Sequence, residues 1–288
     1  MSILINKKTK VLVQGITGTQ ASFHVQRALK YGTKIVAGVV PSKKEDFHLG
    51  IPVFETVKEA KEKTNATASI VFVPAKFAKS AILEAIDAEL ELVVVITSGI
   101  PVGDMMEIKH KLQNSKTILI GPNTPGVITP NEAYMGIFPD NIHNSGNIGI
   151  VSSSSTLTYE IVLEMNKIGL GQSTVVGLGD DFIVGSSVGS IIEKFNKDAK
   201  TKASVIITGI YGNDETEIIE KYSKLKNKKP VIALIIDDNT ALSEANSIAE
   251  LICKNSFDVN DRKNKLRDAG IIVVDNITDL KKELLKVC

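Results

Sequence analysis

A glycine-bounded turn at the end of the first apolar segment carries hydroxyl and amide side chains that could bind a phosphate. Gly15 ends the segment, and Gly18 follows three residues later, so the chain can turn tightly. Thr17, Thr19 and Gln20 can donate hydrogen bonds, and a helix is predicted directly after them, whose free N–H groups favour an anion. This spacing is shorter than a full dinucleotide fingerprint, so an ordinary strand-to-helix turn is the alternative.

A second group of charged residues follows the next apolar segment, residues 34–40. A site for NAD would place an acidic residue there to bind the ribose. This chain instead has Pro41, Lys43 and Lys44. Cations at this point favour a phosphorylated ribose, as in NADP or the 3′-phospho-ADP part of coenzyme A. A solvated lysine pair without a ligand is the alternative.

The elements that position these residues are short runs rich in valine and isoleucine, with helical segments between them. Because the runs are apolar throughout rather than alternating, they predict parallel strands covered on both faces, joined by right-handed crossovers. In such sheets ligands bind beyond the carboxyl ends of the strands. The predicted strands of the first half are 10–15, 34–40, 69–74, 92–97 and 117–122, with helices predicted over 22–32 and 77–89.

The second half repeats this architecture after a segment rich in proline, glycine and asparagine, residues 121–147, which has no helical periodicity. We predict an α/β fold of two doubly wound parallel sheets, with a first domain over 1–122, a connection over 123–147 and a second domain over 148–288. The predicted strands of the second domain are 148–152, 173–179, 203–210, 230–236 and 270–276.

Composition narrows the classes of function. A net charge of only +1 over 288 residues gives no general attraction to nucleic acid or to anionic membranes. No apolar run approaches the roughly 18 residues that span a bilayer, and the first ten residues lack the apolar segment of a secretory signal. Two cysteines do not form a disulfide framework, and no zinc-ligand spacing is present. We therefore expect a cytoplasmic protein without a metal site.

Several segments together resemble the α subunit family of succinyl-CoA synthetase, also called succinate–CoA ligase. The resemblance is nearly gapless from residue 1 to about residue 180 and looser beyond it. The segments that carry it are MSILINKKTKVLVQGITGTQ, YGTKIV, HLGIPVF, ATASIVFVPA, AILEAIDA, GPNTPGVITP and GIVSSSSTLTYE.

The resemblance implies a Rossmann-like CoA-binding domain followed by a flavodoxin-like ligase domain. It also implies a complex with a β-type ATP-grasp subunit, which alone would bind Mg-ATP or Mg-GTP. The family usually has glutamate where this chain has Ser98. The site residues implied are Thr17, Gly18, Thr19 and Gln20 for the CoA phosphates, Lys43 for the nucleotide end of CoA, Ile96, Thr97 and Ser98 for the CoA slot, and Tyr159 for the carboxylic acid substrate.

The ligase half departs from the family where the family carries its phosphohistidine. Aligning the strand 231–236 with the family places Glu244 at the histidine position and Gly209 at the glutamate that orients it. The alternative for Glu244 is an exposed residue of an ordinary amphipathic helix. Nearby, Ser153, Ser155 and Asp180 replace an arginine and two glycines.

Three hypotheses follow, because the four histidines are His24, His48, His110 and His143 and none lies beyond residue 143. The first is an α-type subunit that binds CoA and pairs with a β subunit but has lost or altered the phosphohistidine step. The second is an active acid–thiol ligase that uses other chemistry on succinate or another carboxylate, since a carboxylate can form an acyl phosphate. The third is a non-catalytic module that senses CoA.

Overall fold

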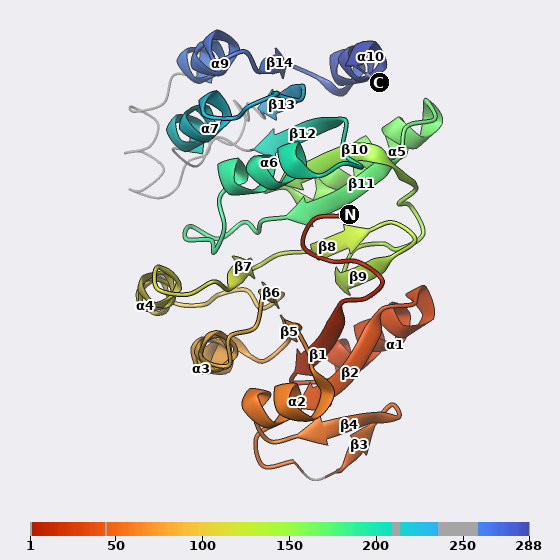
Figure 1. The fold of residues 1–288 in the computed structure, drawn as a ribbon, viewed down its shortest axis with the longest axis vertical. Coiled ribbons are helices and arrows are strands. Elements are labelled where there is room, and N and C mark those ends of the chain that lie inside the picture. Colours follow the sequence, from red (N-terminus) through yellow and green to blue (C-terminus); the bar gives the residue numbers. More distant parts are fainter. Residues whose placement is uncertain (1, 44, 209–213, 236–258, 288) are drawn as a thin grey trace, which may run out of the picture.

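Two seven-stranded sheets lie one above the other along the long axis of the molecule (Figure 1). The computed structural model describes residues 2–43, 45–208, 214–235 and 259–287. Helices cover both faces of each sheet, and in each sheet the central strands are parallel. The predicted α/β class is therefore confirmed.

The first sheet has the strand order β3-β4-β2-β1-β5-β6-β7. Without the short β3, this is the 3-2-1-4-5-6 order of a Rossmann fold, which reverses direction between β1 and β5. Its continuous valine and isoleucine runs are buried on both faces, as in β6, because helices cover both sides. The bounds are β1 (Lys10–Gln14), β2 (Lys34–Val39), β3 (Phe47–His48), β4 (Ile51–Phe54), β5 (Ala68–Val71), β6 (Leu92–Val95) and β7 (Ile118–Ile120).

The second sheet has the order β14-β13-β12-β10-β11-β8-β9. Its five parallel strands follow the 2-1-3-4-5 order of flavodoxin, which reverses between β10 and β12. The bounds are β8 (Gly126–Thr129), β9 (Ala133–Gly136), β10 (Ser145–Ser152), β11 (Gln172–Gly177), β12 (Ala203–Thr208), β13 (Val231–Ile235) and β14 (Ile272–Val274).

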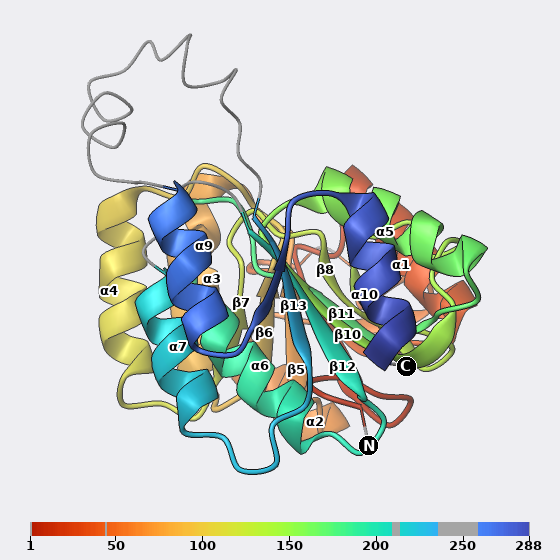
Figure 2. The same cartoon turned by 90° about the horizontal axis from the view of Figure 1, so that it is seen from above.

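The helices form two layers with the sheets between them (Figure 2). One layer contains α1 (Thr19–Tyr31), α5 (Ser155–Lys167) and α10 (Ile277–Val287). The other contains α2 (Val57–Thr64), α3 (Ala75–Asp87), α4 (Val102–Leu112), α6 (Val188–Lys197), α7 (Asp214–Ser223) and α9 (Val259–Asp268). No helix in the described ranges is both long and apolar enough to cross a bilayer.

The predicted connection 123–147 contains two strands that the sequence did not reveal. β8 and β9 form an antiparallel hairpin, and β8 adds antiparallel to β11. A Cβ at Gly126 would lie 2.0 Å from the Met135 carbonyl oxygen, so glycine is needed for the strands to approach. The prediction that both sheets are parallel needs correction at their edges, where this hairpin and the pair β3–β4 are antiparallel. The domain boundaries stay a prediction.

The two halves share a buried interface. The N-terminal segment reaches the hairpin, where the Ile5 carbonyl accepts a 3.0 Å hydrogen bond from the Thr129 hydroxyl. Helix α1 packs against β9, and one cluster of buried apolar residues continues from Ile3 to Leu284. The buried residues of a second cluster, on the α2–α3–α4 side, all belong to the first half, and Ile183 of the second half packs against them.

Candidate functional site

The turn between β1 and α1 has the conformation that the sequence predicted for a phosphate site. Gly15 has a φ of +79°, and its N–H donates to the Val39 carbonyl at 2.9 Å. A Cβ there would lie 3.1 Å from the Val73 side chain, so the turn packs closely against the segment after β5. Gly18 caps α1 without any side-chain hydrogen bond, and the first turn of α1 has no acidic residue. This helix start is open to an anion.

The four predicted phosphate contacts are exposed on this turn. Thr17, Gly18, Thr19 and Gln20 are all accessible to solvent, whereas Gly15 before them is half-buried and Ile16 is buried. The buried residues fix the backbone and the exposed ones present donors. The geometry fits a phosphate group, and the role of these four residues stays a prediction.

Lys43 follows β2 and lies close to the edge of the sheet. Its ammonium donates to the Val53 carbonyl of β4 at 3.0 Å and to the Asp46 carboxylate at 2.8 Å. The hydrogen bond that Lys43 donates to the Asp46 carboxylate is the main cause that raises the pKa of Lys43, and the same contact lowers the pKa of Asp46. Lys43 is therefore a held cation rather than a freely moving one. Lys44 lies outside the described residues.

The residues predicted to line the CoA slot follow β6. Ile96 and Thr97 are half-buried, and Ser98 is exposed. The Thr97 hydroxyl donates to the Val73 carbonyl at 2.6 Å, and its own carbonyl accepts from the Asn123 N–H at 3.0 Å. These bonds tie together the segments that follow β5, β6 and β7.

Sheet topology brings these predicted residues to one edge. β2, β1, β5 and β6 are neighbours and run parallel, so the segments that follow them emerge on the same side. This is the edge at which ligands bind in open α/β sheets. The grouping agrees with a single elongated site, which stays a prediction.

The two halves meet at the end of β7. The N–H of Gly121 donates to the Leu178 carbonyl at 3.1 Å, and its carbonyl accepts from the Gly185 N–H at 2.8 Å. The Thr124 hydroxyl donates to the Gly177 carbonyl at 2.6 Å. The turn after β11, which includes Asp180, therefore adjoins the segment after β7.

In the second half, the turn 152–156 leads from β10 into α5. Ser153 donates its N–H to the Ile207 carbonyl of β12 at 3.0 Å, and Ser154 is the N-cap of α5. The Ser154 hydroxyl accepts the N–H of Leu157 at 3.5 Å, so a polar side chain caps the start of α5. Burial, with the nearby Asp181 carboxylate, raises the pKa of Asp180.

Tyr159 lies on α5 and is half-buried. Its ring packs edge to face on Phe138 with centroids 5.9 Å apart, and burial raises the pKa of its hydroxyl. Part of this ring is thus used in packing between α5 and the connection. A substrate contact stays a prediction. Glu244 and Gly209 lie outside the described residues.

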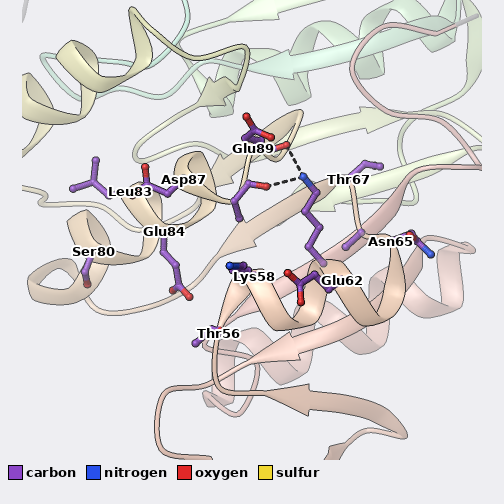
Figure 3. Close-up of a pocket in the computed structure, with 13 residues that line it drawn as sticks. Thr56, Lys58, Glu62, Asn65, Thr67, Ser80, Leu83, Glu84, Asp87 and Glu89 are labelled. Carbon is purple, nitrogen blue, oxygen red and sulfur yellow. Dashed lines mark hydrogen bonds between the residues drawn. The ribbon is translucent and has the colours of Figure 1, made fainter.

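A separate pocket lies away from these predicted residues. An open pocket of about 1100 Å³ lies between α2 and α3, and none of the predicted site residues lines it (Figure 3). The Lys61 ammonium caps α3 by donating to the Ala88 and Glu89 carbonyls at 2.7 and 3.1 Å. The Glu84 carboxylate in turn accepts the N–H of Val57 at the start of α2, at 2.7 Å. These helices use the polar groups of the pocket to cap each other.

Its charge also argues against a phosphate ligand. Four carboxylates line it, and one of its two lysines is the Lys61 that caps α3. The acidic side chains are Glu62, Glu84, Asp87 and Glu89.

Asp46 is the residue of the first-half site that sequence reasoning missed. Sequence reasoning considered the cations of the segment 41–48 but not its acids. The three-residue spacing between Lys43 and Asp46 is the signal that could have revealed the pair.

Comparison with known proteins decides the family. Residues 6–99 match the profile of the CoA binding domain, and residues 145–285 match that of the succinyl-CoA ligase like flavodoxin domain. The α subunit of the ADP-forming succinate–CoA ligase of Aquifex aeolicus is 47% identical over 290 residues, which cover 100% of this chain and 95% of that protein. The chain belongs to the succinate–CoA ligase α-subunit family.

Another member of the family, from Staphylococcus aureus, is 51% identical over 235 residues, 82% of this chain and 78% of that protein. The resemblance inferred from the sequence is thus confirmed, as are the Rossmann-like and flavodoxin-like halves. As a family member with a CoA binding domain, the chain has a CoA-binding role.

Solved structures share the fold at lower identity. ATP citrate lyase from Methanosaeta concilii, solved with (3S)-citryl-CoA, superposes with a TM-score of 0.84 at 21% identity, over 99% of this chain and 50% of that one. A dinucleotide-forming acetyl-coenzyme A synthetase from Ca. Korarchaeum cryptofilum gives 0.75 at 21% identity, over 94% and 59%. This chain spans only about half to three-fifths of those proteins, so they support the fold alone.

Proposed function

We propose that this chain is the CoA-binding α-type subunit of a succinate–CoA ligase complex in which the phosphohistidine step is lost or altered. The observation that carries the proposal is the absence of histidine from the sequence beyond His143. The match to the ligase domain begins at residue 145, so that whole domain has no imidazole. Imidazole is nucleophilic near neutral pH and forms a phosphoramidate that still transfers its phosphoryl group.

The surroundings support this loss. Ser153 stands where the family has a cation, and Asp180 adds a carboxylate beside the junction of the two halves. Both changes make the region less favourable for a phosphate dianion. Glu244, by alignment at the histidine position, could carry phosphate only as an acyl phosphate, which would be altered chemistry.

The proposal includes a β-type ATP-grasp partner that would bind Mg-ATP or Mg-GTP. The relatives from Aquifex and Staphylococcus are named as α subunits, which supports a heteromer. Co-purification with a β-type subunit is the test, and a chain that stays alone would favour the non-catalytic CoA-sensing module.

Labelling with γ-³²P nucleotide in the presence of the cognate β subunit tests the phosphoryl step. We expect no acid-labile, base-stable label on this chain. Such a label is typical of phosphohistidine, and its appearance would refute the proposal. A base-labile label that hydroxylamine removes would instead identify a carboxylate carrier, and Glu244→Gln should then abolish it.

Calorimetric titration with CoA tests the first-half site. Lys43→Glu should weaken CoA binding at least about tenfold, because a charge reversal acts directly on a phosphate contact. Lys34→Glu is the matched control: it makes the same charge change at the start of β2, on the opposite edge of the sheet, and should leave affinity unchanged. Equal affinity in the Lys43 variant and the unmodified chain would remove the site assignment.

A further inference from the structure

Two contacts hold the ammonium of Lys43 in place, and one of them is with a carboxylate. It contacts the Val53 carbonyl at 3.0 Å and the Asp46 carboxylate at 2.8 Å. An ammonium has three N–H donors, so among the described residues one donor is left for a ligand. The Lys43 side chain is 29% exposed, whereas that of Asp46 is 81% exposed. The lysine is therefore held by the protein, while the carboxylate faces water.

The segment that follows β2 is balanced in charge. Residues 41–48 contain Lys43 and Lys44 but also Glu45 and Asp46. Of the two acids, Asp46 contacts the Lys43 ammonium, while the Glu45 carboxylate lies 4.0 Å from the imidazole of His48. The carboxylate of Asp46 thus occupies a position next to the one cation that the proposed function assigns to the ribose phosphate of CoA.

We propose that Asp46 is an internal competitor of the ligand phosphate, so that it weakens CoA binding and reduces the preference for a 3′-phosphorylated ribose. This inference rests on the proposed function. An arriving phosphate must either displace the carboxylate from Lys43 or share the ammonium with it. In the second case two anions lie within a few ångströms of each other, and their repulsion opposes binding. A ligand without the ribose phosphate meets neither obstacle.

Replacing Asp46 with asparagine tests the effect of the Asp46 charge alone. In Asp46→Asn the side-chain oxygen can still accept a hydrogen bond from Lys43, so the lysine keeps its position while the competing charge is removed. We expect CoA to bind about two- to fivefold more tightly to this variant, in the range set by exposed ion pairs, while dephospho-CoA binds as before. The preference for CoA over dephospho-CoA should rise by the same factor.

Glu45→Gln is the matched control, because it removes the same charge one residue away without touching Lys43. Calorimetric titrations of CoA and dephospho-CoA into the full chain and the two variants measure both affinities, and their ratio gives the preference for CoA in each protein. Weaker CoA binding to Asp46→Asn would show that Asp46 positions the lysine, and an equal gain in both variants would show an effect of net charge only. Either result overturns the inference. If the unmodified chain binds no CoA, it is the proposed function that fails.

Discussion

Thr33 and Tyr134 exchange two hydrogen bonds across the interface between the two halves. The Thr33 hydroxyl donates to the Tyr134 carbonyl at 3.0 Å and accepts the Tyr134 N–H at 2.9 Å. Both residues are buried, with 4% and 0% of their surface exposed. One side chain at the start of β2 thus satisfies both backbone groups of a residue in β9.

Replacing Thr33 with valine should destabilise the protein by about 1–3 kcal/mol, because the isosteric change leaves a buried N–H and a buried carbonyl without partners. Urea denaturation measures the free energy of unfolding. Thr33→Ser keeps the hydroxyl and should recover most of the loss. A valine variant as stable as the unmodified chain would show that water replaces the hydroxyl.

His143 should make stability depend on pH. Burial lowers its pKa to about 4, although its hydrogen bond to the Pro139 carbonyl and the nearby Asp140 carboxylate oppose the shift. In the unfolded chain its pKa is about 6.5. Between these values the unfolded chain binds a proton that the folded chain does not. Stability is therefore complete above about pH 6.5 and decreases as pH falls toward 4, by up to about 3 kcal/mol.

Urea denaturation at several pH values between 7.5 and 4.5 checks this dependence. His143→Asn can still donate to the Pro139 carbonyl but cannot take up a proton, so its stability should fall less steeply. The comparison isolates His143 from His24, whose pKa burial also lowers. Equal slopes in the two proteins would contradict the prediction.

Gly179→Ala should disrupt the junction between the halves. Gly179 has a φ of +102°, and a Cβ there would lie 1.9 Å from the Pro122 carbonyl oxygen. We expect a loss of several kcal/mol or failure to fold, because backbone atoms on both sides must move. Gly103→Ala, in α4 with open space around it, is the control and should stabilise by up to about 1 kcal/mol. Thermal denaturation distinguishes the two, and a soluble Gly179 variant of unchanged stability would contradict the geometry.

Glu215→Gln should be costly because it breaks a buried ion pair. The Glu215 carboxylate accepts a hydrogen bond from Arg262, and their side chains are only 10% and 5% exposed. Removing the negative charge of Glu215 from beside the buried guanidinium should destabilise by about 3–5 kcal/mol. Glu220→Gln removes the exposed partner of Lys224 and should change the stability little, because water screens this pair. Similar unfolding free energies for both variants would contradict the burial of the pair.

The sequence predicted the central strands well because their signal is local. Continuous valine and isoleucine runs such as those of β6 and β13 have one stable environment, between two layers of helices. Gly15 and Gly18 likewise predicted a turn from local sequence. The hairpin β8–β9 was missed because its glycines allow two strands to approach, and the same residues are typical of loops.

The first-half site was predicted only as far as its residue types. Lys43 was expected to contact the nucleotide end of CoA. Its contact with the Val53 carbonyl was not expected, because that contact depends on how β4 pairs with β2, and no pattern around Lys43 predicts that register. Tyr159 was assigned by resemblance alone, and its packing on Phe138 depends on the long-range placement of α5.

The hairpin β8–β9 has a consequence for exchanging parts between members of this family. Its hydrogen bonds place it in the second sheet. Its Tyr134, however, packs on the Tyr31 ring at the end of α1 and bonds to Thr33 just beyond it. A chimera joined at residue 99, where the first recognised domain ends, would separate α1 from the tyrosine that matches it. A successful graft of the first half must therefore also include about forty further residues of the donor, so that the hairpin comes from the same protein as α1.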